Sequence, residues 1–189
     1  MIDWKTASPF LTVPERVPYR PDELLGVLER HRVRYVVIGG LAAELRGSPY
    51  ITRDVDVTPS RDRANLRRLA AALRELNATL RVPGVEGPVE FPLDEHSFTW
   101  GTTWTFVTDH GYLDLAFLPD GTRGYDDLRR DATREQLTES LQVEVASLAD
   151  VIRSKEAAGR EKDRAVLPIL RQVLERSRLR ERPGPEIGF

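Results

Sequence analysis

The sequence predicts an α/β or α+β fold with a helical tail at its C-terminal end. Strand-like apolar runs and helical patterns follow one another along the 189-residue chain, an order typical of helices packed against a sheet. A glycine turn joins the first predicted strand to the helix after it, and only helical patterns follow residue 147. These observations favour one domain with a helical appendage.

The N-terminal part is predicted to contain an arm, a helix and a strand. Residues 1–20 are rich in proline and are expected to form an irregular arm. Residues 21–30 place several leucines on one side of a short helix. The apolar run 34–38 predicts a strand, which ends at two glycines.

The next segment is predicted to hold a second strand between two helices. Residues 41–46 have a helical pattern, and residues 50–58 are expected to form a strand. From Ser60 as N-cap, a longer helix is predicted to reach Leu76, because leucines recur there at helical spacing.

The middle of the chain is predicted to extend the sheet. Residues 82–92 are rich in glycine and proline and read as a loop, and strands are expected around residues 98–107. The apolar run 111–118 predicts a further strand, closed by a turn at Pro119, Asp120 and Gly121.

The C-terminal part is predicted to be one strand followed by helices. Residues 141–146 alternate like a half-buried strand, and Ser147 and Asp150 resemble a capping box. Helices are expected from there to about Arg180. Pro168 is predicted to kink or divide the last helix unless it lies in a first turn.

Composition limits the classes of function. The chain has no cysteine and no apolar run that resembles a signal or a membrane span, so a cytoplasmic protein is expected. The net charge is −2 overall, yet residues 151–182 carry ten Lys or Arg against five acidic residues. Contact with nucleic acid therefore requires this local patch. The arginines after position 171 are nevertheless predicted to solvate the helix rather than to recognise a ligand.

The most informative pattern is a glycine pair followed by an acidic pair. Gly39 and Gly40 let the backbone approach a ligand, and a helix start there can direct N–H groups at an anion such as a triphosphate. Asp54 and Asp56 lie two apart on a strand and therefore share a face. Two adjacent carboxylates repel one another unless a cation lies between them, and magnesium suits such ligands. Asp114, within an apolar strand, also needs a cation nearby.

These residues resemble the DNA polymerase β-like nucleotidyltransferases and, within them, the AbiEii/MenT-type toxins of bacterial toxin–antitoxin systems. Three elements mark the superfamily: the run from Ile38 to Gly40, the run from Thr52 to Asp56, and Leu113 to Leu115. The toxin group is indicated by the helical run from Ser147 to Lys155 with the segment from Gly159 to Asp163.

The resemblance implies a small mixed sheet flanked by helices, with two magnesium ions held by Asp54, Asp56 and Asp114. Catalysis is then expected from these three carboxylates. It also implies a nucleotidyltransferase core over residues 21–124 and a region, 125–189, that completes the nucleotide pocket. The nucleotide-binding residues implied are Gly39, Gly40, Arg53, Lys155, Arg160, Lys162 and Asp163. The family often has serine where this chain has Gly40, so a hydroxyl contact to phosphate is missing.

The resemblance also implies a reaction and its partners. A nucleotide from an NTP, often a pyrimidine (CTP or UTP), is expected to be added to the 3′-OH of the tRNA acceptor end, which blocks translation. A cognate antitoxin protein is expected to inhibit the enzyme. Two alternatives stay open: a transferase that modifies a protein (adenylylation) or a small molecule, and a non-catalytic module that binds nucleotide or RNA.

Overall fold

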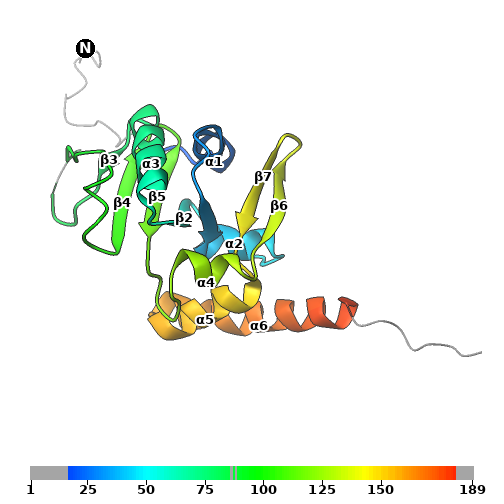
Figure 1. The fold of residues 1–189 in the computed structure, drawn as a ribbon. Coiled ribbons are helices and arrows are strands. Elements are labelled where there is room, and N and C mark those ends of the chain that lie inside the picture. Colours follow the sequence, from blue (N-terminus) through cyan, green and yellow to red (C-terminus); the bar gives the residue numbers. More distant parts are fainter. Residues whose placement is uncertain (1–16, 86, 88, 182–189) are drawn as a thin grey trace, which may run out of the picture.

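Seven strands form one mixed sheet in the computed structural model, which describes residues 17–85, 87 and 89–181 (Figure 1). In spatial order the strands are β3 (Thr79–Leu80), β4 (Thr103–Thr108), β5 (Gly111–Ala116), β2 (Asp54–Pro59), β1 (Tyr35–Ile38), β7 (Leu141–Val145) and β6 (Thr133–Thr138). The pairs β2–β5 and β1–β7 are parallel, and the other pairs are antiparallel. The mixed sheet confirms the predicted fold class.

Helices flank this sheet. They are α1 (Pro21–Arg30), α2 (Gly39–Leu45), α3 (Arg63–Glu75), α4 (Tyr125–Arg129), α5 (Leu148–Ala158) and α6 (Glu161–Glu181). In Figure 1, α5 and α6 run side by side across one end of the sheet, and α1 and α3 lie towards the other end. The last two helices form the predicted helical tail.

The two faces of the central strands have opposite character. On β2, Val55 and Val57 are at most 1% exposed, and on β5, Leu113 and Leu115 are fully buried. The residues between them point to the other face because side chains alternate along a strand. The core therefore lies against one face, and the polar residues of β2 and β5 are left for the opposite face. Burial of each such leucine or valine contributes roughly 1.5–3 kcal/mol.

Several element boundaries differ from the sequence expectation. Helix α2 begins at Gly39 rather than at residue 41, and β2 begins at Asp54 rather than at residue 50. The N-cap of α3 is Asp62, whose carboxylate accepts a hydrogen bond from the Asn65 N–H at 3.0 Å. The predicted cap, Ser60, instead donates its hydroxyl to Asp62 at 2.8 Å. A carboxylate two residues later therefore takes the capping position.

Pro168 was predicted to kink or divide the last helix, and the division does not occur there. Pro168 lies inside α6 without ending it. The helices are instead separated at Gly159, which adopts a left-handed conformation with φ +61° and caps α5. Glycine adopts such a φ without steric cost, so the chain can leave the helix at this position.

Two strands and one strand boundary were missed. The short strand β3 and the polar strand β6 carry no apolar alternation that would predict them. Strand β6 forms because it pairs with β7 at the edge of the sheet. The strand expected around residues 98–107 begins only at Thr103, and Phe98 lies in a turn, fully buried.

The predicted division of the chain stays a prediction. Most of the predicted arm, residues 1–20, lies outside the described residues; at its end the Arg20 N–H donates to the His110 carbonyl at 2.9 Å. Strands β6 and β7, from the region 125–189, belong to the same sheet as the strands of the region 21–124.

Over the part of the chain that the structure describes, no helix is both long enough and apolar enough to cross a membrane.

Candidate active site

One cavity of about 620 Å³ lies against the polar face of β2 and β5 and is closed by residues of α2, α5 and α6. Ligand pockets for small molecules have volumes of about 300–1,000 Å³. The residues that line it include every site residue predicted from the sequence: Gly39, Gly40, Arg53, Asp54, Asp56, Asp114, Lys155, Arg160, Lys162 and Asp163. The structure therefore brings together residues that are up to 124 positions apart, from 39 to 163. The function of each stays a prediction.

Three carboxylates gather on the cavity side of the sheet. Asp56 and Asp114 are directly opposite one another on the parallel strands β2 and β5, and Asp54 precedes Asp56 by two residues. Burial, followed by the negative charges of Asp54 and Asp114, raises the pKa of Asp56 to about 7, although a hydrogen bond from the Gly40 N–H acts to lower it. Burial also raises the pKa of Asp114, with a smaller contribution from Asp54. The site is thus electrostatically strained without a cation.

The oxygen atoms of these carboxylates are incompletely satisfied. Asp114 Oδ1 is buried and has no hydrogen-bond partner among the described residues, while Asp54 accepts a hydrogen bond from the Thr52 hydroxyl. A buried, unpartnered carboxylate oxygen is costly unless a cation or a donor reaches it. Carboxylate oxygens are the ligands that magnesium prefers. Within the described ranges, however, no group of three or more His, Cys, Asp or Glu side chains is placed so that it could hold a metal ion. Asp54, Asp56 and Asp114 supply suitable oxygen donors, and a magnesium ion here would need further ligands, such as the oxygens of a bound triphosphate.

Both glycines are required by the close approach of side chains. A Cβ on Gly39, where φ is +65°, would lie 2.1 Å from Asp56 Oδ2, and a Cβ on Gly40 would lie 2.7 Å from Thr52 Oγ1. Thr52 therefore occupies the space that a serine at position 40 would need. The Gly40 N–H donates to Asp56 and is therefore not free to bind an anion. This differs from the sequence expectation that N–H groups at the helix start are directed at a triphosphate.

The positive wall of the cavity comes from α5 and α6. The Lys155 ammonium lies 2.9 Å from Asp163 Oδ1, and the Asp163 side chain is only 5% exposed. This ion pair fixes the position of Lys155, whose charge also acts on Asp56. Arg160 is more exposed and lies 3.8 Å from Asp120. The positive charge of Lys162 acts to lower the pKa of Asp114.

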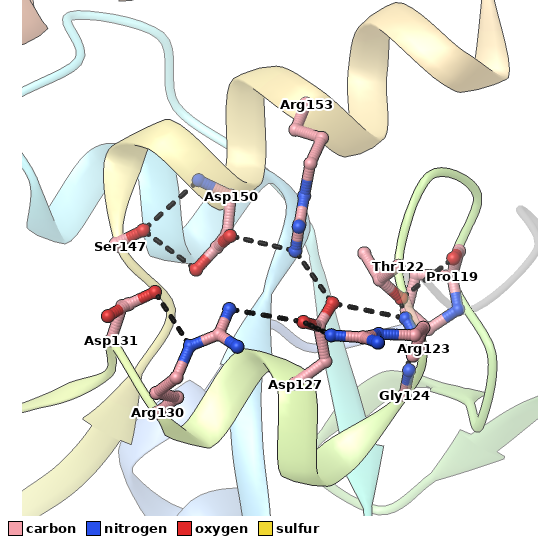
Figure 2. Close-up of polar contacts among 10 residues, drawn as sticks. All are labelled: Pro119, Thr122, Arg123, Gly124, Asp127, Arg130, Asp131, Ser147, Asp150 and Arg153. Atoms are coloured by element: carbon pink, nitrogen blue, oxygen red, sulfur yellow. Dashed lines mark hydrogen bonds and ion pairs between the residues drawn. The ribbon is translucent and has the colours of Figure 1, made fainter.

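A second charged cluster was not predicted from the sequence (Figure 2). Thr122 and Asp150 of this group also line the cavity. The Asp127 side chain is 3% exposed; Arg153 donates to it at 2.8 Å and Arg130 at 3.2 Å. The Arg123 N–H donates to Asp127 at 3.1 Å, and this hydrogen bond is the main cause of the lowered pKa of Asp127. The charge of Arg153 lowers the pKa as well, whereas burial acts to raise it. Arg153 also donates to Asp150 at 2.8 Å. The cluster joins α4 to α5, two residues before Lys155.

Sequence reasoning could have found only part of this cluster. The spacing of Asp150 and Arg153, three residues apart on a helix, is a local signal for an ion pair. The contact of Arg153 with Asp127 joins residues 26 positions apart and has no local signal. Two further cavity residues, Tyr50 and Ile51, were read as part of a strand.

The chain is similar to the lincosamide antibiotic adenylyltransferase LnuA, solved with lincomycin bound, at a TM-score of 0.53 and 14% sequence identity, over 80% of this chain and 94% of that chain. This is a nucleotidyltransferase fold. At 14% identity this likeness shows the fold alone, and it does not establish the AbiEii/MenT group.

Two further likenesses to proteins of the nucleotidyltransferase kind are weaker. A candidate nucleotidyltransferase from Thermotoga maritima has a TM-score of 0.48 and 18% identity, over 88% of this chain and 98% of that chain. ANT(2″)-Ia in complex with adenylyl-2″-tobramycin has a TM-score of 0.39 and 12% identity, over 79% of this chain and 93% of that chain. The fold assignment rests on the first likeness alone. No protein-family model and no curated protein sequence matches the chain.

Proposed function

We propose that this chain is a metal-dependent nucleotidyltransferase that transfers a nucleoside monophosphate from an NTP to an acceptor hydroxyl. The observation that carries the proposal is the face-to-face placement of Asp56 and Asp114, with Asp54 beside them, in a cavity with Lys155 on its opposite wall. A set of repelling carboxylates faced by a lysine suits a triphosphate with its cations.

The carboxylates would hold magnesium, in two ions, through Asp54, Asp56 and Asp114. When bound, magnesium would neutralise charge on the triphosphate and lower the pKa of the acceptor hydroxyl. Lys155, positioned by Asp163, would donate to a phosphate oxygen. Asp114 Oδ1, which has no partner in the described structure, would accept the proton of the hydroxyl.

The reaction proposed is a single displacement at the α-phosphorus. The acceptor oxygen forms a bond to that phosphorus, the bond to the bridging oxygen of the β-phosphate breaks, and pyrophosphate leaves. Arg160 and Lys162, which line the cavity, would offset the charge of the leaving group. Arg53 lies on the exposed edge of the cavity and would contact the nucleotide there.

For the acceptor we propose the 3′-OH of tRNA, with the enzyme as a cytoplasmic toxin that is held inactive by an antitoxin. The resemblance of the Lys155 and Gly159–Asp163 elements to the AbiEii/MenT toxins supports this choice, and so does the basic composition of residues 151–182. A pyrimidine triphosphate, CTP or UTP, is the proposed donor. A small-molecule acceptor is the second candidate, because LnuA, by its name, adenylylates a lincosamide antibiotic.

Labelled triphosphates test the proposal. The protein is incubated with magnesium and each α-labelled NTP in turn, in the presence of total RNA, of soluble protein, or of a lincosamide. We expect label on a tRNA band that grows by one or a few nucleotides, and none with Asp56→Asn. Label on protein or on the antibiotic would support the other acceptors. Absence of label from every acceptor, with a folded protein, would point to a non-catalytic binding module.

A further inference from the structure

An exposed apolar edge borders the cavity next to the carboxylates. Tyr50 and Ile51 line the cavity, yet Tyr50 is 46% exposed and Ile51 is 81% exposed. We call these two residues the apolar lip. They precede Asp54 by only four and three residues, so the lip lies within about 13 Å of that carboxylate. Large apolar side chains at the mouth of a polar cavity indicate contact with a ligand.

A row of arginines on α6 begins beside the loop that carries the lip. Val173 Cγ1 lies 3.7 Å from the Cβ position of Gly47, at the start of this loop. Arg176 and Arg180 follow Val173 by three and seven residues and therefore share its helix face. They lie about 4.5 and 10.5 Å further along the helix axis. We call Arg176 and Arg180 the basic face.

The basic face is available for a ligand. Both arginines are exposed, and neither forms an ion pair with any residue that the structure describes. Arg178, between them in sequence, is exposed as well but points to the opposite side of the helix because helical neighbours are about 100° apart. The sequence expectation was that all arginines after position 171 only solvate the helix. That expectation does not separate the helix face of Arg176 and Arg180 from the opposite face of Arg178.

We infer that the apolar lip and the basic face together bind the single-stranded 3′ end of an RNA acceptor. The terminal base would stack on Tyr50, and the preceding phosphates would follow Arg176 and Arg180. An aromatic ring next to a positively charged track is the arrangement that binds single strands without sequence preference. A small-molecule acceptor would have no use for the basic face, which continues past the last α6 residues that line the cavity. The inference rests on the proposed transfer to RNA and names the surface that receives it.

Direct binding tests the surface without requiring catalysis. A short fluorescein-labelled single-stranded RNA with a free 3′-OH is titrated with the full chain, without NTP, and followed by anisotropy. We expect Tyr50→Ala to weaken binding roughly tenfold and Tyr50→Phe to retain it, because one stacked base contributes about 1–3 kcal/mol. Circular dichroism verifies that each variant is folded.

The two sides of α6 provide the matched control. The single variants Arg176→Ala and Arg180→Ala are each expected to reduce the slope of log affinity against log salt by about 0.7, the value for one lost phosphate contact, and Arg178→Ala by much less. Equal reductions from the three single variants would overturn the inference in favour of unspecific charge attraction. So would a wild-type chain that labels a non-RNA acceptor but binds no RNA, and that result would leave the transferase proposal standing. A chain that neither binds RNA nor transfers label would overturn both.

Discussion

The pKa is shifted in opposite directions in two groups of carboxylates in this molecule. In the cavity, Asp56 lies opposite Asp114, its pKa is raised to about 7, and Asp114 Oδ1 has no partner in the described structure. The Asp127 side chain, which is 3% exposed, is instead paired with Arg153 and Arg130, and its pKa is lowered. The ionised form of an aspartate is thus destabilised in the cavity and stabilised in the Asp127 cluster.

The difference separates a structural role from a functional one. The Asp127 cluster joins α4 to α5 and needs nothing from outside the chain (Figure 2). The cavity carboxylates keep a repulsion that the fold could have relieved with an arginine, as it does for Asp127. Perturbed pKa values and unsatisfied oxygens of this kind are concentrated at functional sites.

The largest expected effect is on catalysis. Asp56→Asn is predicted to reduce nucleotide transfer by more than about a thousandfold, equivalent to roughly 4 kcal/mol in the activation barrier, because a cation ligand is lost. The same change removes a repulsion, so the melting temperature is expected to stay the same or rise. Transfer rates and thermal melts of the purified variant measure both. A variant that is inactive because it is unfolded would contradict the comparison.

The pH dependence of stability should have opposite signs in the two groups. The pKa of Asp56 is about 7 in the folded chain against an ordinary value of 3.8, so the folded state binds a proton more tightly than the unfolded state. Its contribution to stability is present below pH 3.8 and is lost as the pH rises towards 7, by an amount on the order of a few kcal/mol. The lowered pKa of Asp127 has the reverse effect, with stability lost as the pH falls through its folded value.

Urea denaturation in EDTA between about pH 4.5 and 8 measures this slope. The difference in unfolding free energy between wild type and Asp56→Asn should shift with pH in favour of the variant as the pH rises. A difference that does not change with pH would mean that Asp56 ionises normally.

A smaller effect is expected at the paired carboxylate. Asp127→Asn is predicted to lower the free energy of unfolding by about 2 kcal/mol, because Arg153 and Arg130 lose a charged partner. Asp126→Asn is the matched control, since that neighbour is exposed, and it should cost less than about 1 kcal/mol. If both changes have the same effect in chemical denaturation, the cluster adds nothing to stability.

The smallest effect concerns magnesium binding without nucleotide. At a magnesium concentration ten times its dissociation constant, the wild-type chain should gain about 1.4 kcal/mol, or a few degrees in melting temperature. Asp56→Asn should gain little, whereas Asp127→Asn should gain as much as wild type. Sodium chloride at equal ionic strength controls for screening. Equal gains in wild type and Asp56→Asn would place the cation elsewhere.

The sequence predicted the cavity better than its surroundings, for a physical reason. Asp54 and Asp56 share a face because a strand repeats every two residues, and Gly39 and Gly40 were recognised because glycine permits close approach. Both signals are local. The contact of Arg153 with Asp127 depends on how distant segments pack, which no local pattern contains.

The sequence predictions of helix and strand boundaries were wrong where contacts with distant segments determine those boundaries. Strand β6 is polar and forms because β7 offers it a partner, and α6 passes through Pro168 although local propensity favours a break. Gly159, which does separate the last helices, has the usual sequence signal of a helix end. The Lys155 and Asp163 pair across this glycine was matched by resemblance, and its geometry came only from the structure.

The pairing of β1 with β7 joins Val37 to Val145, so the middle of the sheet is completed by a strand that follows β1 by more than 100 residues in the chain. Lys155 and Asp163 follow later still. A nascent chain that stops before residue 141 therefore has its acidic residues but lacks both the neighbouring strand and the lysine wall. The cavity is expected to form only after residues 141–163 have been synthesised and have folded against the rest of the sheet.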